Sequence, residues 1–305
     1  MTTPSVPRAT ESASGVAARA PAWSLAVLSM TLIQLGAALS TGLFSAVGPA
    51  GTAWLRLCAG GAMFLAFRRP RLRGRTRGEL AGAVGLGVIS GVMTMSFLSA
   101  LARIPLGTTV AIEFLGPLTV AVLGTRRLRR MAWPVLALAG VSALTEPWTG
   151  AVDALGIAFA AVSGLGWGSY ILLTARVGDR FEGLEGLSVT IPIAAVTATL
   201  VAGPGAIGRV TPPVMAAAVG LALLMTVIPY SLELLALRRL TTSAFGTLMA
   251  LEPAIATVMG ALVLAQVPTP LQTLGVLLVV VAGIGATRGG HRLTPAQNAA
   301  IATVE

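Results

Sequence analysis

The sequence predicts an all-α membrane protein with ten transmembrane helices in two inverted five-helix repeats. Three observations lead to this prediction: an apolar composition, an alternation of arginine-rich and arginine-poor loops, and an internal repeat. Of the 305 residues, 55% are hydrophobic and only 10% are charged, and the mean hydropathy is +0.86. An average soluble domain carries roughly 25% charged residues. The composition therefore argues against a soluble globular fold.

Ten apolar runs, ended by charged residues, glycine or proline, account for most of the chain. A run of about 20 apolar residues can cross a hydrocarbon core of about 30 Å as a helix. The fifth run is short and carries Pro134 near its start, which makes it the weakest of the ten. The runs cover approximately residues 22–44, 48–67, 80–101, 105–124, 131–146, 155–176, 187–204, 212–236, 241–265 and 270–287.

The loops test this helix count independently, because cytoplasmic loops are enriched in arginine and lysine. With a cytoplasmic N-terminus, the loops after even-numbered runs should be basic, and residues 68–77 indeed read RRPRLRGRTR and residues 125–130 read TRRLRR. We therefore expect both ends, residues 1–21 and 289–305, to be short cytoplasmic tails. The formal net charge of +10 then reflects membrane topology and not nucleic-acid binding, which needs a basic face with stacking aromatics.

One cysteine and one histidine limit the chemistry that the chain can carry. Cys58 is the sole cysteine, and His291, the sole histidine, lies in the C-terminal tail. Neither an intramolecular disulfide nor a Cys/His zinc cluster can be built. No nucleophile, base and orienting group recur at a recognisable spacing either, so we expect no enzyme, no metal and no cofactor.

Two segments of the chain resemble each other. ALARIPLGTTVAIEFLGP (100–117) and ALRRLTTSAFGTLMALEP (236–253) share a glycine six residues before a glutamate and a proline after it, so that Glu113 corresponds to Glu252. Five helices per repeat force the two copies, expected at residues 22–147 and 155–288, to insert in opposite senses. An inverted repeat around a midplane site is typical of transporters.

Four ionisable side chains fall inside the apolar runs: Arg56, Glu113, Glu233 and Glu252. A charge at the centre of a membrane helix costs about 2.5 to 3.5 kcal/mol, so each needs a partner or a water-filled cavity. Glu113 and Glu252 are the stronger candidates for a role in substrate or proton binding, because the repeat places both at comparable depth. Desolvation there favours the protonated form of a carboxyl group. Arg56 could instead form an internal ion pair with one glutamate, and Glu233 could reach an interface.

Several further residues are candidates of lower rank. An aromatic side chain with a polar tip suits a wet pocket, but the interfacial aromatic belt or plain packing is the favoured explanation for these aromatic residues. Pro117 and Pro253, which follow the two glutamates, free backbone carbonyls and permit either hinges or static bends. The candidate pocket residues are Gln34, Trp167, Tyr170 and Tyr230.

The segments 28–61, 100–127 and 237–266 together resemble the EamA branch of the drug/metabolite transporter superfamily, and most closely its RhtA-like threonine/homoserine exporters. The resemblance implies a ten-helix fold in a bacterial inner membrane that exports small metabolites with energy from the proton gradient. By the same resemblance, Arg56 matches the arginine of the family's second helix, and Glu113 and Glu252 match the acidic residues of its fourth and ninth. Ala265-Gln266 departs from a common Gly-Glu pair, so no role of that glutamate carries over.

The leading functional hypothesis is a secondary exporter of small amino acids that works by alternating access with proton antiport. Its expected partners are a small-molecule substrate, protons and the lipid bilayer, with a homodimer left open. For an amino acid zwitterion, Glu113 or Glu252 could accept from the ammonium, and Arg56 or a helix N-terminus could bind the carboxylate. A drug or other-metabolite exporter of the same fold is one alternative, and a non-transporting receptor or scaffold is another.

Overall fold

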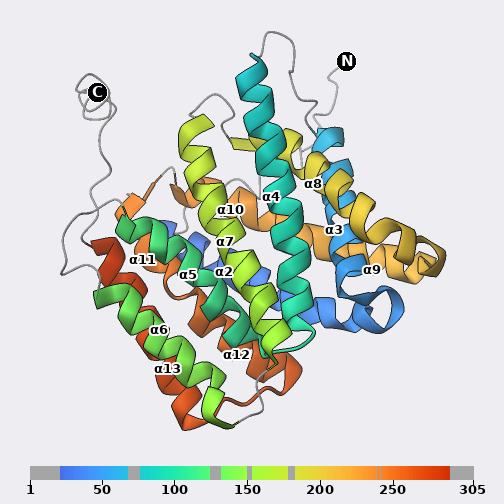
Figure 1. Ribbon diagram of the computed structural model, residues 1–305. Helices are drawn as coiled ribbons and strands as arrows, with labels where there is room; N and C mark the ends of the chain where they lie inside the picture. Colours follow the sequence, from blue (N-terminus) through green and yellow to red (C-terminus); the bar gives the residue numbers. More distant parts are fainter. Residues whose placement is uncertain are drawn as a thin grey trace, which may run out of the picture.

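The computed structural model describes residues 21–67, 76–123, 132–149, 153–177, 183–237, 239–240 and 242–288. These residues form helices joined by short connections, with no strand among them. Residues 1–20 of the expected N-terminal tail, the expected C-terminal tail, and the residues 68–75 and 124–131 that hold the arginine runs lie outside the described residues. Figure 1 shows the helices packed as one bundle.

The helices follow the apolar runs closely. In chain order they are α2 (Ala22–Ser40), η1 (Thr41–Leu43), α3 (Phe44–Phe67), α4 (Arg77–Leu101), α5 (Leu106–Leu123), α6 (Ala132–Thr145), η3 (Pro147–Thr149), α7 (Ala154–Val177), α8 (Gly183–Ala206), η5 (Ile207–Arg209), α9 (Pro212–Ala222), η6 (Leu223–Val227), α10 (Ile228–Leu237), α11 (Thr242–Met249), α12 (Glu252–Leu264) and α13 (Pro270–Arg288).

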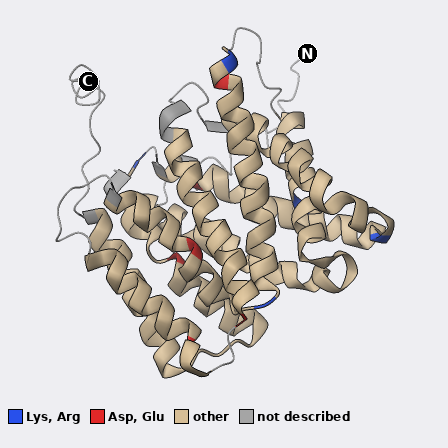
Figure 2. Ribbon diagram, viewed as in Figure 1, with Lys and Arg blue, Asp and Glu red and all other residues tan. Residues whose placement is uncertain are grey.

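Seven segments of the described chain are long and apolar enough to cross a membrane, judged by length and composition. A shorter apolar helix covers Leu106–Val122. Figure 2 shows how sparse charged residues are along these helices. The chain is thus a multi-pass, all-helical membrane protein, while the count of ten spans and the inverted repeat stay predictions. The seven segments are Ala22–Phe67, Arg77–Leu101, Ala154–Thr174, Gly186–Arg209, Pro212–Glu233, Ala244–Leu264 and Pro270–Thr287.

Two runs that the sequence predicts as single spans contain interruptions. In the run 212–236, the π-helical turn η6 separates α9 from α10. In the run 241–265, Ala250 and Leu251 leave the helical state between α11 and α12. π-helical turns are rare and are frequently found at functional sites. Both interruptions lie in the second half of the chain.

Close helix contacts depend on glycine. α4 packs against α7 and α8, and α5 packs against α7 and α12. A Cβ atom on Gly87 of α4 would lie 2.5 Å from the side chain of Ile193 in α8, so only glycine permits this approach. At the other side of the bundle α6 and α13 run side by side (Figure 1).

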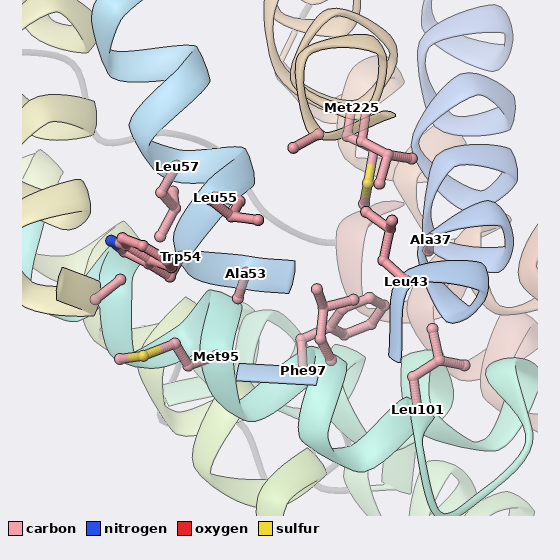
Figure 3. Close-up of a cluster of buried hydrophobic side chains, with 14 of the residues drawn as sticks. Ala37, Leu43, Ala53, Trp54, Leu55, Leu57, Met95, Phe97, Leu101 and Met225 are labelled. Atoms are coloured by element: carbon pink, nitrogen blue, oxygen red, sulfur yellow. The ribbon is translucent and has the colours of Figure 1, made fainter. Parts of the chain in front are cut away.

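The largest apolar cluster among the described residues joins helices of the first and second halves of the sequence. It gathers side chains of α2, α3, α4 and α5 with those of α8, α9, η6 and α12. Figure 3 shows part of it, with Trp54 and Met225 at opposite sides. The members labelled there are Ala37, Leu43, Ala53, Trp54, Leu55, Leu57, Met95, Phe97, Leu101 and Met225.

Candidate functional site

Four polar side chains from four helices are buried in the interior of the bundle. Gln34 of α2 is 2% exposed, Arg56 of α3 is 8% exposed, Glu113 of α5 is 9% exposed and Glu252 of α12 is 4% exposed. All four were candidates from the sequence. Burial of a charged group is costly unless a partner or a ligand compensates it, so the partners of each one decide what the site can do.

Glu113 receives a hydrogen bond from the second half of the chain. The hydroxyl of Ser163 in α7 lies 2.5 Å from Glu113 Oε1 and 3.1 Å from the carbonyl oxygen of Met93 in α4. Gly164 lets α7 approach this closely, because a Cβ there would lie 2.9 Å from the Glu113 carbonyl oxygen. The small residues around Ser163 thus place its hydroxyl against the carboxyl group.

Glu252 has a less complete environment. It is the first residue of α12, directly after the Ala250–Leu251 interruption, and the buried Pro253 follows it. Gln34 lies within hydrogen-bonding reach of its carboxyl group. Within the described part of the chain, however, Glu252 Oε2 and Gln34 Oε1 have no hydrogen-bond partner.

One donor of Arg56 has a weak partner, and another has none among the described residues. Its Nη1 donates to the sulfur of Met225 at 3.4 Å, and its Nε has no hydrogen-bond partner among the described residues. Glu113 and Tyr230 are close enough to act on it electrostatically. Over the described ranges no carboxylate lies within 4.0 Å of Arg56, so the internal ion pair considered for it is not formed there.

Glu233, Tyr170 and Tyr230 form a half-buried extension of this group. Glu233 of α10 accepts a hydrogen bond from Ser29 of α2 at 2.9 Å. Tyr230, one turn before it, and Tyr170 of α7 lie near enough to Glu233 to interact electrostatically. The structure therefore brings these three candidates together beside the buried ones.

Trp167 and the two prolines show no hydrogen bond to the buried polar group among the described residues, although Pro253 directly follows Glu252. Trp167 packs edge-on against Phe114, with ring centroids 6.4 Å apart and an interplanar angle of 72°, inside an apolar cluster. Pro117 lies within α5, which continues through it, whereas Pro253 lies in the first turn of α12. The geometry of Trp167 matches packing, and the geometry of Pro253 matches the interruption beside it.

A second polar region lies at the bundle end where α4 leads into α5. Gln266 Oε1 accepts the backbone N–H of Leu106 at 3.0 Å, so a residue after α12 caps the start of α5. Arg103 and Asp153 form an exposed ion pair at 3.1 Å, and the Gly156 N–H and then Arg103 hold the pKa of the Asp153 carboxyl below its usual range.

A cavity of about 620 Å³ opens beside this ion pair. Its lining includes Pro49, Phe159 and the paired Arg103 and Asp153. Its two charges already neutralise each other, so the cavity offers less to a charged ligand than the buried group does.

The buried group therefore presents one free donor and two free acceptors. The donor is Arg56 Nε, and the acceptors are Gln34 Oε1 and Glu252 Oε2. Unsatisfied buried polar atoms are costly, each at about 1 to 3 kcal/mol, and call for a ligand or an ordered water. An anionic group is the natural partner of this donor, and a cationic group is the natural partner of these acceptors.

Three residues of this site were not anticipated. Ser163, Ser29 and Met225 contact Glu113, Glu233 and Arg56 respectively. The only sequence signal was the small-residue run around Ser163, SGLGWGS, which indicates close helix contact but not a partner. Neither Ser29 nor Met225 stands out in an apolar segment.

Three comparisons with known proteins give the family and the fold of the chain. Residues 154–287 match the family model described as the EamA-like transporter family. The threonine/homoserine exporter RhtA of Escherichia coli (strain K12) is 36% identical over 280 residues, which are 88% of this chain and 92% of that protein. The threonine/homoserine exporter RhtA of Salmonella typhimurium (strain LT2) is 35% identical over 286 residues, or 90% and 94%. A solved crystal structure that is 21% identical has a TM-score of 0.55 over 88% of this chain and 99% of that one, which shows a common fold.

Proposed function

The chain belongs to the EamA-like transporter family, and from this premise we propose that it exports small amino acids such as threonine and homoserine across a bacterial inner membrane. Its relatives are transporters and not enzymes. The export is secondary active transport, driven by proton antiport and carried out by alternating access.

The observation that carries this proposal is the set of three unpartnered atoms. An amino acid has a carboxylate that Arg56 can bind and an ammonium group that needs an acidic acceptor, for which Glu113 and Glu252 are both in place. Charge-assisted hydrogen bonds of this kind are roughly twice as strong as neutral ones. A cationic drug would use the acceptors and leave Arg56 Nε unsatisfied, which favours a zwitterion.

The same residues support a proposed transport cycle. We propose ten spans in two inverted repeats with cytoplasmic termini, so that α5 and α12 carry the matching glutamates from opposite directions. A carboxyl group in a dry interior can hold a proton in one state and release it in another. Tyr170, Tyr230 and Glu233 then line the half-buried side of the site.

The test is efflux of labelled threonine and homoserine from preloaded cells that express the protein, with and without a protonophore. Glu113→Gln is expected to lower proton-driven efflux at least tenfold, about 1.4 kcal/mol or more. Arg103→Gln is the control, because Arg103 is exposed, follows the end of α4 and pairs with Asp153, not with a residue of the buried group. Immunodetection in the membrane fraction shows that each variant is inserted.

The outcomes separate the alternatives. Efflux that collapses with the protonophore and in Glu113→Gln supports a proton-coupled amino acid exporter. Resistance of the same cells to cationic dyes, without amino acid efflux, would show that the transported substrates are drugs. No flux of either kind would favour a receptor or scaffold. The mass of the purified protein distinguishes a monomer from the homodimer.

A further inference from the structure

Met225 lies at the meeting point of three helices and touches the one cation of the buried site. It belongs to the π-helical turn η6 and is 6% exposed. Its sulfur lies 3.4 Å from Arg56 Nη1 of α3 and 3.6 Å from the hydroxyl of Ser40 at the end of α2. Figure 3 places Met225 beside Ala37 and Leu43, on the α2 side of the apolar cluster.

The backbone of α2 fixes the direction of the Met225 side chain. A Cβ atom on Gly36 would collide with Met225 Cγ and would lie 3.1 Å from its sulfur, so the methionine rests directly on the glycine. The π-helical turn lies between α9 and α10, which are both regular α-helices. Such a turn holds an extra residue and changes which side chains of the following helix face inward.

A thioether is an unusual partner for a buried guanidinium. The sulfur is a weak, uncharged acceptor, so it orients the guanidinium without neutralising it. Glu113 is near enough to attract Arg56 electrostatically but lies beyond ion-pair distance. Without the sulfur, the guanidinium would turn toward Glu113, since a buried charge gains most from an opposite charge.

We propose that Met225 is the positioning residue of Arg56: its thioether holds the guanidinium away from Glu113 and keeps the positive charge available for the carboxylate of the transported amino acid. This inference rests on the proposed function. It assigns to the π-helical turn a role in recognising the anionic end of the substrate. A substrate carboxylate is a stronger acceptor than the Met225 sulfur, so it can replace the sulfur as the partner of Arg56.

The experiment compares two ligands that differ only at the carboxylate, threonine and its amino alcohol threoninol. Binding to the purified protein is measured by isothermal titration in detergent. Met225→Leu keeps the volume and removes the acceptor, and it should weaken threonine binding about tenfold while leaving threoninol binding unchanged. Met95→Leu, the same change at another methionine of the same apolar cluster, should alter neither.

Two further variants separate positioning from packing. Gly36→Ala should displace Met225 and repeat the selective loss of threonine binding, whereas Gly220→Ala, at a position with open space around it, should not. Adding Glu113→Gln to Met225→Leu removes the competing charge and should recover threonine binding to within about threefold of the wild-type value.

The results distinguish failure of this inference from failure of the proposed function. A wild-type protein that binds neither ligand contradicts the proposed function and this inference with it. If wild type binds threonine but Met225→Leu binds it equally well, loses both ligands together, or is not rescued by Glu113→Gln, then Met225 does not position Arg56 and the proposed function stands.

Discussion

Glu113 and Glu252 occupy matching places in two similar segments, but their surroundings differ. Glu113 lies inside the uninterrupted helix α5 and receives the hydroxyl of Ser163 at 2.5 Å. Glu252 begins α12 after the interruption at Ala250–Leu251, and its Oε2 has no partner within the described ranges. One carboxyl group is thus tied to a neighbouring helix, and the other presents a free oxygen beside Gln34.

The comparison teaches that a sequence repeat preserves a residue without preserving its backbone or its partners. The proline that follows each glutamate lies four residues later in the first segment and one residue later in the second. In the second segment it lies in the first turn of a helix, where a missing N–H costs least. We expect the two carboxyl groups to contribute unequally. The first two of the four measurements below test this, and the last two test contacts around the first segment.

The largest effect should come from replacing each carboxyl group by an amide. Glu252→Gln should weaken threonine binding at least tenfold, about 1.4 kcal/mol or more, because the ammonium group loses its free charged acceptor. Glu113→Gln should weaken it by only about two- to threefold, since glutamine still accepts the Ser163 hydrogen bond. Isothermal titration of the purified variants measures both, and equal losses would erase the distinction drawn between them.

The second test removes the partner of Glu113. Ser163→Ala leaves a buried carboxyl oxygen without its donor and should lower the free energy of unfolding by about 1 to 3 kcal/mol. Ser142→Ala is the matched control, because Ser142 is exposed and its hydroxyl donates to the carbonyl oxygen of Leu138 in its own helix. Thermal unfolding in detergent compares them, and identical midpoints for the two variants would contradict the importance of the Ser163 contact.

The third test concerns the contact between Gln266, which follows α12, and the start of α5. Gln266→Ala removes the cap on the Leu106 N–H and should cost about 1 kcal/mol of stability, as loss of a helix N-cap does. Gln266→Glu keeps an acceptor there and should retain most of it. Hydrogen exchange at the first turn of α5 is the direct measurement, and unchanged protection in Gln266→Ala would show that the cap contributes nothing.

The smallest effect is expected at the exposed pair beside the first segment. The pKa of Asp153 is lowered in the folded state, chiefly by the Gly156 N–H and also by Arg103, so its ionised form stabilises the fold above the unfolded value near 3.9. This contribution is lost as the pH falls through the folded-state pKa. The melting temperatures of wild type and Asp153→Asn should differ slightly at pH 7, and the difference should shrink as the pH falls below about 3.9. A difference that does not change with pH would contradict this assignment.

Much of the fold could be predicted because apolar length is visible in the sequence. The runs expected at 80–101 and 270–287 correspond to α4, Arg77–Leu101, and α13, Pro270–Arg288. The interruptions in the runs 212–236 and 241–265 were not visible, since an apolar run looks the same whether its backbone is α-helical, π-helical or broken.

The candidate site, like the fold, could be predicted from the sequence only in part. Arg56, Glu113, Glu252 and Gln34 could be found because a polar side chain in an apolar run is costly, and the structure buries all four. The residues that contact these four side chains could not be predicted from the sequence. Met225 acts on Arg56 through a single weak contact between distant segments, and no local pattern records such a contact.

The three unpartnered atoms also bear on the handling of the protein outside its membrane. Extraction into detergent removes the lateral pressure of the bilayer, and water can then reach the unsatisfied polar atoms of the interior. The protein without ligand should therefore be less stable in detergent than the protein with ligand bound. A ligand that binds only the folded form adds about 2.7 kcal/mol of stability at one hundred times its dissociation constant. Millimolar threonine during solubilisation should therefore lengthen the lifetime of the purified protein. The same additive should reduce the number of conformations that the protein adopts, which helps structure determination.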